Sequence, residues 1–383
     1  MAYKIINRKK LYMTALADLI GSIIWGLPKL FKTAECIISS EISKILFIRT
    51  AYVGDVVMTL PILKPLREQF PKAKITFLTS SSAVPILEHN PYIDEIVPFN
   101  AFWFYPAGQD DYFRFIKSFR QREFDLVIEA RGDIRDLLFI VRPLKSRYKV
   151  SSGIGGGWYF LSHRVPTDGR QHRVEYHLDL IRFLGCKTDT RDGHIYLTDA
   201  EQSRVDEVLK NSGVSPPFVA VHPGSRMPLK IWPSEKCAAL YDLIMAEFNL
   251  PLMVLGGPDE EALIRDILTR MKHKPIDLSG RLNLRELAAV LSRSRLFICN
   301  DSAPMHIAAA MKTSTVAIFG PSKSCETGPY GGVQHRVVEK EFPCRFTCDE
   351  STCLNKVHNA CMHAISPEDV FAQVKELMAS LGR

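Results

Sequence analysis

The chain has 383 residues, of which 46% are hydrophobic and 24% charged, and its formal net charge is +7. This length suggests about two domains, and the balance of apolar and charged residues excludes large-scale disorder. A transmembrane helix is not expected, because Asp18, Gly21, Gly26 and Pro28 interrupt the most apolar stretch, residues 11–30.

Residues 1–40 are predicted to be a basic, amphipathic extension. Three basic residues at 8–10 precede the apolar stretch, and Lys29 and Lys32 lie at its C-terminal end. One interpretation is a helix that lies in a membrane interface, anchored by Trp25. Its basic flanks would favour anionic lipid and hence a peripheral position at the inner, cytoplasmic face of the cytoplasmic membrane. The alternative is a helix packed on the surface of the first domain.

Apolar strand-like runs alternate with helical runs in the first half of the chain. This alternation is typical of a doubly wound parallel sheet, and we expect a Rossmann-like domain over residues 41–202. The predicted strands are 44–48, 74–79, 95–99 and 124–129, and the predicted helices are 56–69, 83–90 and one that ends near residue 122.

A second run of the same kind predicts another Rossmann-like domain over residues 218–383, after an inter-domain connection at 203–217. This domain would end in a helix and contain a group of cysteines. The predicted strands are 218–222, 252–256, 276–278, 296–300 and 315–319, and the helices are 234–249 (with Ser234 as N-cap), 260–272, 284–292 and 303–311. Ligands of such α/β proteins bind where the carboxyl ends of the strands meet, here in a cleft between two domains.

The turn after the first strand, residues 48–57, carries Gly54 followed by Asp55. A nucleotide-binding turn at this place would carry three glycines. A single glycine followed by a carboxylate indicates a catalytic or acceptor-binding turn instead.

Four loops at the strand ends of the second half have the composition of a phosphate or nucleotide site. A serine hydroxyl, a lysine, glycines and a helix N-terminus can together bind a diphosphate, and an acid can bind ribose. The loops are 222–226 followed by Lys230, 256–260, 300–306 and 320–322. Each residue also has a plainer interpretation as a helix cap, a turn or a surface charge.

Nine cysteines fall into two groups. Five are scattered and are typical of reduced residues in a cytoplasmic protein. The other four, Cys344, Cys348, Cys353 and Cys361, are spaced C-x3-C-x4-C-x7-C. They could hold zinc or an iron–sulfur cluster, but the spacing matches no strong ligand pattern, and a locally packed loop is the alternative.

The order and spacing of these motifs over about residues 44–380 resemble glycosyltransferase family 9, the ADP-heptose:lipopolysaccharide heptosyltransferases. The matching residues are Arg49-x4-Gly54-Asp55, His222-Pro223-Gly224 with Lys230-x-Trp232, Gly257-Pro258-x-Glu260, Asp301-Ser302-x3-His306 and Gly320-Pro321-Ser322.

This resemblance implies a GT-B architecture and an inverting, metal-independent sugar transfer without a required cofactor. Asp55 would be the general base on the acceptor side. The residues implied at the donor, which would be a nucleoside diphosphate sugar such as ADP-heptose, are Ser225, Arg226, Lys230, Glu260, Leu282, Asp301, Ser302, Ala303 and His306.

Basic side chains of the first domain can face an acidic, lipopolysaccharide-core-like glycolipid acceptor. The candidates are Arg49, Lys64, Arg67, Arg131 and Arg135, and the alternative is a solvated basic face. We expect the donor, the glycolipid and an anionic membrane surface as partners, and no nucleic acid. Two other functions stay open: a sugar-nucleotide epimerase or hydrolase on the same frame, and a non-catalytic glycan-binding or assembly protein.

Overall fold

The computed structural model describes residues 8–26, 36–167, 169, 171–188, 191–346, 348 and 350–382, without the side chains of 8–10 and 346. The chain divides into two compact units, Met1–Thr190 and Arg191–Arg383, here called the N-terminal and C-terminal units. The division falls before the connection predicted at 203–217. Most of helix α8 (Asp199–Asn211) occupies that segment and packs on the C-terminal unit.

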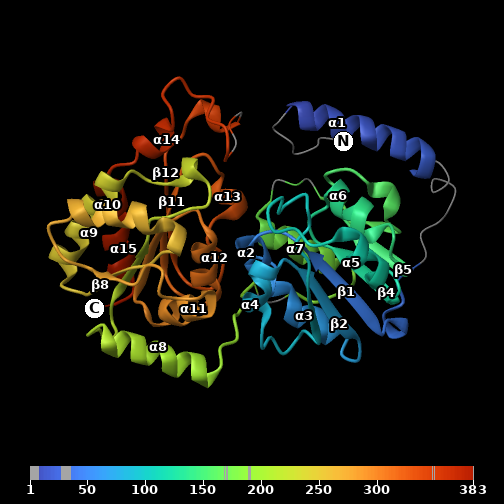
Figure 1. Cartoon of the computed structure of the whole chain (residues 1–383), viewed down its shortest axis with the longest axis horizontal. Helices are drawn as coiled ribbons and strands as arrows, with labels where there is room; N and C mark the ends of the chain where they lie inside the picture. Colours follow the sequence, from blue (N-terminus) through green and yellow to red (C-terminus); the bar gives the residue numbers. More distant parts are fainter. Residues whose placement is uncertain are drawn as a thin grey trace. The chain divides into compact units, whose positions relative to one another are not determined.

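The described part of the N-terminal unit forms one six-stranded parallel sheet in the order β3-β2-β1-β4-β5-β6 (Figure 1). Its central strand β1 is fully buried from Ile45 to Ile48, since neighbouring strands and helices cover it. The elements are α1 (Arg8–Gly21), β1 (Lys44–Arg49), α2 (Val53–Val57), α3 (Leu63–Gln69), β2 (Lys74–Thr79), α4 (Val84–Leu87), β3 (Glu95–Pro98), α5 (Tyr112–Phe119), β4 (Phe124–Glu129), α6 (Ile134–Asp136), β5 (Ser146–Ser151), β6 (His163–Arg164) and α7 (Arg173–Arg182).

The prediction of a single helix over residues 56–69 is wrong. The segment consists of α2, a 3-10 turn η4 (Leu60–Ile62) and α3. Pro61 lies in η4, where it has no N–H to donate and its ring excludes a regular α-helical turn. The interruption leaves α2 as one short turn that carries Asp55 near its start.

The helix predicted near the N-terminus is present as α1, continued by the π-helical turn η1 (Ser22–Gly26). It packs on the N-terminal unit: the buried Asp18 carboxylate accepts a hydrogen bond from Gly157 N–H at 2.7 Å, and Trp25 stacks on Tyr159. In the described part of the chain, no helix is both long and apolar enough to cross a membrane. The basic side chains predicted to flank the helix lie outside the described residues.

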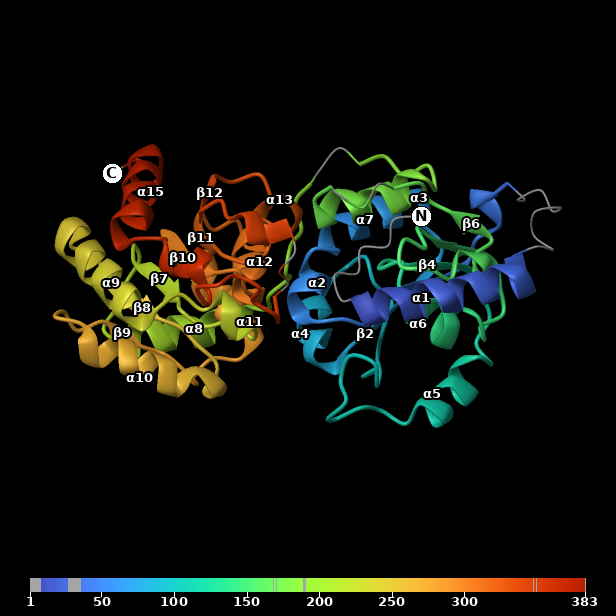
Figure 2. The same cartoon turned by 90° about the horizontal axis from the view of Figure 1, so that it is seen from above.

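The described part of the C-terminal unit also forms a six-stranded parallel sheet, in the order β12-β11-β10-β7-β8-β9. Helices α9, α10 and α15 pack together, and α8, α11 and α12 form a second group (Figure 2). The elements are β7 (Val219–His222), α9 (Ser234–Phe248), β8 (Leu252–Val254), α10 (Glu261–Arg270), β9 (Ile276–Asp277), α11 (Leu284–Arg293), β10 (Leu296–Asn300), α12 (Ala303–Ala310), β11 (Thr315–Phe319), α13 (Ser324–Thr327), β12 (His335–Glu339), α14 (Ala360–His363) and α15 (Pro367–Ser380).

The predicted class of two Rossmann-like parallel-sheet domains is therefore confirmed. Ser234 was predicted as the cap of α9 but is its first residue. The N-cap is Pro233, whose carbonyl accepts hydrogen bonds from Lys236 N–H and Cys237 N–H.

Candidate active site

Asp55 lies at the carboxyl end of the central strand β1, in the first turn of α2. Its Oδ1 accepts a hydrogen bond from Arg49 Nη2 at 2.7 Å, and the Arg49 side chain is 5% exposed while that of Asp55 is 29% exposed. Arg49 is the last residue of β1, so strand and helix together hold this pair in place. The structure thus presents an oriented carboxylate to solvent at the sheet edge where α/β proteins bind ligands.

A cavity of about 540 Å³ on the N-terminal unit contains Asp55, and we call it the Asp55 cavity. Arg49, Arg131, Arg135 and Arg173 line it, and Asp133 is the other acid. Asp133 pairs with Arg135 at 2.6 Å and with Arg131 at 3.4 Å. Four arginines and two acids leave the lining positive, which suits an anionic ligand.

The structure does not bring Lys64 and Arg67, the other two predicted acceptor residues, to this cavity. Lys64 is an exposed residue of α3 that pairs with Glu68 at 3.7 Å. The guanidinium of Arg67 binds the carbonyls of Ala73 and Tyr92 and the carboxylate of Asp94, so it clamps neighbouring loops. Their placement fits a structural role better than one in ligand binding.

Sequence reasoning missed Arg173 and Tyr176, which line the Asp55 cavity from α7. No strong apolar run marks this helix in the sequence. The hydroxyl groups of Tyr176 and Ser152 lie 2.6 Å apart, and burial raises the pKa of Tyr176 beyond its ordinary range. The only signal in the sequence was the spacing of Arg173 and Tyr176, which lie three positions apart and so share one face of a helix.

Two buried acids behind the cavity were also missed. Glu129, at the end of β4, accepts hydrogen bonds from Arg131 N–H, Gly132 N–H and the Ser151 hydroxyl. Burial, reinforced by the nearby Asp136 carboxylate, raises the pKa of Glu129 to about 8. Burial thus disfavours the charged form of Glu129, and its hydrogen bonds tie the β4–α6 loop that carries Arg131 to strand β5.

On the C-terminal unit, Lys230 and Asp301 form the centre of a polar cluster. Lys230 Nζ lies 2.8 Å from Asp301 Oδ2 and 2.9 Å from Glu350 Oε1. Ser225 Oγ donates to the Asp301 carbonyl, and the Ser322 hydroxyl donates to the Asp301 carboxylate. Burial alone would lower the pKa of Lys230, but the two carboxylates outweigh it and raise the pKa. Three of the four predicted loops therefore meet around one buried ammonium group.

The remaining predicted loop, residues 256–260, places Glu260 beside His222. Glu260 Oε2 lies 3.0 Å from His222 Nε2 and accepts a hydrogen bond from Gly257 N–H at 2.8 Å. Burial disfavours the charged carboxylate, but His222 and Gly257 outweigh this effect and lower the pKa of Glu260. A Cβ atom on Gly224 would lie 1.7 Å from Glu260 Oε1, so this close approach requires glycine.

The remaining predicted donor residues lie at or near the same sheet edge. Ser302 is the N-cap residue of α12, Ala303 begins that helix, and His306 is buried within it. Arg226 is exposed in the loop after β7, and Leu282 is half-buried between β9 and α11. The helix dipole of α12 adds partial positive charge close to Asp301.

The four clustered cysteines line one small cavity of about 10 Å³ with Leu229 and Pro321. Three of the sulfur atoms accept hydrogen bonds at 3.3 Å, from Leu354 N–H, the Asn355 side-chain amide and Asn359 N–H. Burial raises the pKa of the Cys348 and Cys361 thiols. Within the described residues, no group of three or more His, Cys, Asp or Glu side chains is arranged to hold a metal ion. Metal binding and a locally packed loop stay the two alternatives for these thiols.

Comparison with known proteins places this chain in a family. The family model described as glycosyltransferase family 9 (heptosyltransferase) matches residues 112–358, well over half of the chain. The chain belongs to glycosyltransferase family 9. It is therefore a glycosyltransferase, as the motifs at the two sheet edges predicted.

Relatives of this family 9 protein match over most of its length. It is 28% identical over 344 residues to lipopolysaccharide heptosyltransferase 3 of Escherichia coli strain K12, covering 85% of this chain and 96% of the relative. The crystal structure of a family 9 glycosyl transferase from Veillonella parvula superposes with a TM-score of 0.78 at 21% identity, covering 91% of this chain and all of the other. E. coli heptosyltransferase WaaC, solved with ADP, gives a TM-score of 0.65 at 17% identity, covering 87% and 99% of the two chains. The fold is the GT-B type of these enzymes.

Proposed function

We propose that this family 9 glycosyltransferase moves a heptosyl group from ADP-heptose to a lipopolysaccharide-core-like acceptor, with inversion and without a metal ion. The observation that carries the proposal is the Asp55 carboxylate, oriented by Arg49 at the edge of a parallel sheet and lining a cavity rich in arginine. The names of the relatives, a lipopolysaccharide heptosyltransferase and an enzyme crystallised with ADP, support the choice of donor and acceptor class.

In the proposed reaction, Asp55 accepts the proton of an acceptor hydroxyl group. The hydroxyl oxygen then forms a bond to the anomeric carbon of the donor, from the face opposite the diphosphate. The bond between that carbon and the diphosphate oxygen breaks, and its electron pair leaves with ADP. This displacement inverts the anomeric configuration and needs one base and stabilisation of one anionic leaving group.

The leaving group would be stabilised by the C-terminal unit. Lys230 supplies a full positive charge, while Ser225 and the amides of Ser302 and Ala303 at the start of α12 supply hydrogen bonds. Glu260 would bind the ribose, the segment ending at Leu282 would flank the adenine, and Arg226 and His306 would lie beside the phosphates or sugar. A lysine and a helix N-terminus make a metal unnecessary for this step.

The acceptor would bind the N-terminal unit through its acidic groups. Arg49, Arg131 and Arg135 line the Asp55 cavity, and Arg173 joins them. The Arg131 and Arg135 guanidinium groups lie 4.2 and 4.9 Å from the centre of the Phe104 ring, which limits their motion. Guanidinium groups held in this way suit carboxylate or phosphate substituents of a core sugar.

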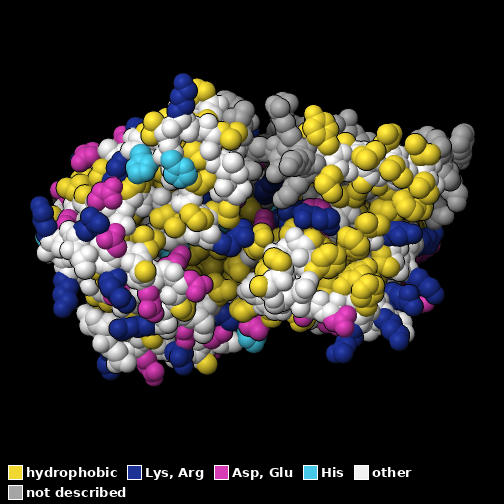
Figure 3. Space-filling model, turned by 45° about the horizontal axis from the view of Figure 1, so that its top comes forward, with side chains coloured by type: hydrophobic (Ala, Val, Ile, Leu, Met, Phe, Trp, Pro, Cys, Tyr) yellow, Lys and Arg dark blue, Asp and Glu magenta, His cyan; other side chains and the backbone are white. Residues whose placement is uncertain are grey.

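We also propose that α1 and η1 dock the enzyme on an anionic membrane at the cytoplasmic face. Hydrophobic side chains gather over this segment (Figure 3), although Asp18 and Trp25 hold it on the domain. The exposed ones are Tyr12, Met13, Leu16, Leu19, Ile20, Ile23, Ile24 and, in part, Trp25. An apolar face of this size on a helix with basic neighbours in the sequence is typical of interfacial binding.

The central test is Asp55→Asn, which keeps the size of the side chain but removes the base. We expect kcat for heptosyl transfer to fall about 10²- to 10⁴-fold, while ADP affinity, measured by calorimetry, stays within twofold. Glu68→Gln, which removes an exposed acid of α3, is the matched control and should change neither quantity. Turnover of Asp55→Asn within a few-fold of wild type would overturn the mechanism.

A further inference from the structure

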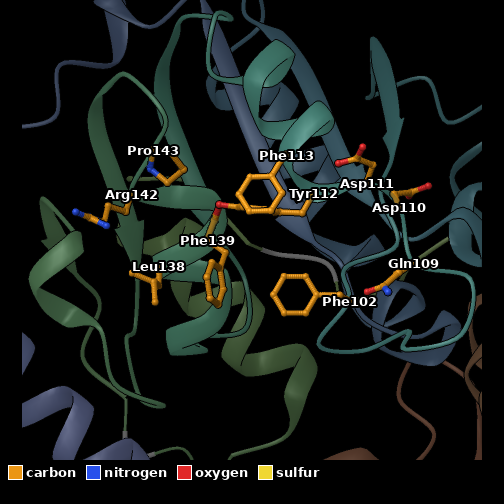
Figure 4. A pocket seen from close by; sticks show the side chains of 10 residues that line it. All are labelled: Phe102, Gln109, Asp110, Asp111, Tyr112, Phe113, Leu138, Phe139, Arg142 and Pro143. Atoms are coloured by element: carbon orange, nitrogen blue, oxygen red, sulfur yellow. The ribbon is translucent and has the colours of Figure 1, made fainter.

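The N-terminal unit contains a second and larger cavity, of about 1090 Å³, which we call the aromatic pocket. Figure 4 shows rings from three separate segments gathered around it: Phe102 from the loop after β3, Tyr112 and Phe113 from the start of α5, and Phe139 from the π-helical turn η6 (Leu137–Val141). Leu138 of η6 adds to the apolar wall. Its volume is slightly above the range of about 300–1,000 Å³ that is usual for ligand pockets in proteins.

Three polar side chains that line the aromatic pocket make hydrogen bonds within the protein. The Tyr112 hydroxyl donates to the Phe139 carbonyl at 3.0 Å, and the Asp111 carboxylate caps α5 by accepting from Arg114 N–H. The Asp110 carboxylate accepts from Asn100 N–H. In contrast, the Phe113 side chain is 80% exposed. The pocket thus offers apolar surface that an apolar occupant would remove from water.

The aromatic pocket adjoins the Asp55 cavity through two segments. One segment runs from Phe102, which lines the pocket, to Phe104, whose ring lies under two arginines of the cavity. The other runs along α6 and η6, where Arg135 lines the cavity and Phe139 lines the pocket. Four helical residues span roughly 6 Å. The two sites are close enough for one molecule to occupy both.

The aromatic pocket also adjoins the apolar face of α1 and η1. Arg142 lines the pocket, and its guanidinium lies 5.0 Å from the centre of the Trp25 ring. The Asp55 cavity adjoins the same helix, because Met13 and Thr14 of α1 line it. An amphiphile that leaves a membrane at the α1 face would therefore have both sites within reach. The positive charge of Arg142 between the pocket and Trp25 suits the anionic head-group region of such a molecule.

We propose that the aromatic pocket holds an acyl chain of the lipid-linked acceptor while the sugar of the same molecule lies in the Asp55 cavity. This inference rests on the proposed function, because it assigns the apolar end of the acceptor whose polar end that function places at Asp55. The pocket makes the enzyme selective for an acylated acceptor and holds its hydroxyl group near the base.

The kinetic test compares an acylated acceptor with the same acceptor after removal of its acyl chains, both below their aggregation concentrations. In the wild type we expect a KM about tenfold lower for the acylated form. Phe113→Ser removes an exposed ring without opening the core and should abolish most of this difference, changing kcat/KM for the deacylated acceptor by less than twofold. Phe183→Ser, at an exposed phenylalanine that lines neither cavity, is the control.

A binding test separates this inference from the proposed reaction. The full chain is titrated with 11-(dansylamino)undecanoic acid, a fluorescent fatty acid, in the wild type, Phe113→Ser, Leu138→Trp and Phe183→Ser. We expect at least fivefold weaker binding in the Phe113 and Leu138 variants only. Equal binding in all four proteins, or equal KM values for the two acceptors in the wild type, would overturn the acyl-chain site. Probe binding without transfer to either acceptor would refute the proposed function and leave an apolar-ligand site standing.

Discussion

The two units each carry a buried acid at the end of the strand next to the central one. In the N-terminal unit, strand β4 lies beside the central strand β1 and ends at Glu129. In the C-terminal unit, strand β10 lies beside the corresponding strand β7 and is followed by Asp301. Both acids are buried, and each accepts a hydrogen bond from a serine of the next strand or its loop, Ser151 or Ser322. Asp301 faces Lys230, whereas Glu129 is bound by backbone amides and has a raised pKa.

The same strand order therefore supports two different electrostatic arrangements. Read from β9 to β12, the second sheet has the same order of strands as the first read from β3 to β6. On the N-terminal unit, the buried Glu129 holds a loop of arginines in place, and these arginines line the cavity. On the C-terminal unit, the buried lysine is itself the main cation at the edge. The two units therefore differ electrostatically in the loops that follow their strands and not in the order of the strands themselves.

Among the changes that test this comparison, Lys230→Ala should have the largest effect. The change should lower kcat/KM for transfer at least 100-fold, and loss of the cation should also cost about 3–5 kcal/mol of unfolding free energy because it leaves the Asp301 carboxylate buried. Adding Asp301→Asn should recover most of the stability, measured by urea unfolding, without recovering transfer. Lys274→Ala, at an exposed lysine, is the control. Recovery of transfer in the double variant would show that Lys230 acts only through Asp301.

Glu129→Gln tests the opposite arrangement. Folding raises the pKa of Glu129 from its ordinary value of 4.5 to about 8, so between pH 4.5 and pH 8 the folded state binds this proton more tightly than the unfolded state does. The unfolding free energy should then fall as pH rises from about 4.5 to 8, with Glu129 contributing up to about 1.4 kcal/mol per pH unit. Glu129→Gln should flatten this dependence in urea titrations, whereas Glu68→Gln should not. An unchanged slope would mean that Glu129 is ionised in the folded protein.

Gly224→Ala should have a moderate effect confined to the donor side. The added methyl group meets the Glu260 carboxylate, the mobile end of a side chain, so the fold should tolerate it while Glu260 moves away from His222. We expect ADP affinity to fall about tenfold, on the order of 1.4 kcal/mol. Because the effect acts through Glu260, Gly224→Ala combined with Glu260→Gln should bind ADP no more weakly than Glu260→Gln alone. Additive losses would contradict this account.

The smallest expected effect is on membrane attachment. Replacing Leu16 and Ile20, exposed on α1, by serine should weaken binding to vesicles that contain anionic lipid by a few-fold to tenfold, because less apolar surface enters the interface. Transfer to a soluble deacylated acceptor should not change. Leu243→Ser, at an exposed leucine of the C-terminal unit, is the matched control. Equal vesicle sedimentation of all three proteins would rule out α1 as the docking element.

The sequence sufficed for the parts of the fold that have strong local patterns. Buried strands such as 44–48 and 296–300 are continuous apolar runs, and the loops after them contain the glycines, acids and lysine that the structure brings together. The prediction of one helix over residues 56–69 failed because the apolar periodicity of the sequence continues through Pro61, whereas the backbone geometry of this proline interrupts the helix. Elements with mixed composition, such as β5 and α7, were missed for lack of such patterns.

Within the site, sequence reasoning recovered groups next to glycine-rich turns but not groups contributed from afar. Glu350 contacts Lys230 across 120 positions of the chain, and nothing local distinguishes it from any other exposed acid. Likewise Lys64 and Arg67 were grouped with Arg131 by charge alone. Their helix α3 lies beyond the η4 interruption, so the structure turns them to other partners.

The contact between Lys230 and two carboxylates has a consequence for the order of events on the C-terminal unit. One ammonium group beside Asp301 and Glu350 leaves a local charge of about −1 before any ligand arrives. In the proposed function, a diphosphate that binds Lys230 would displace the half-exposed Glu350 more readily than the buried Asp301. Glu350 lies between Cys348 and Cys353 in the chain, so the exchange would take place beside the cysteine cluster, and the return of Glu350 would compete with ADP for the same lysine.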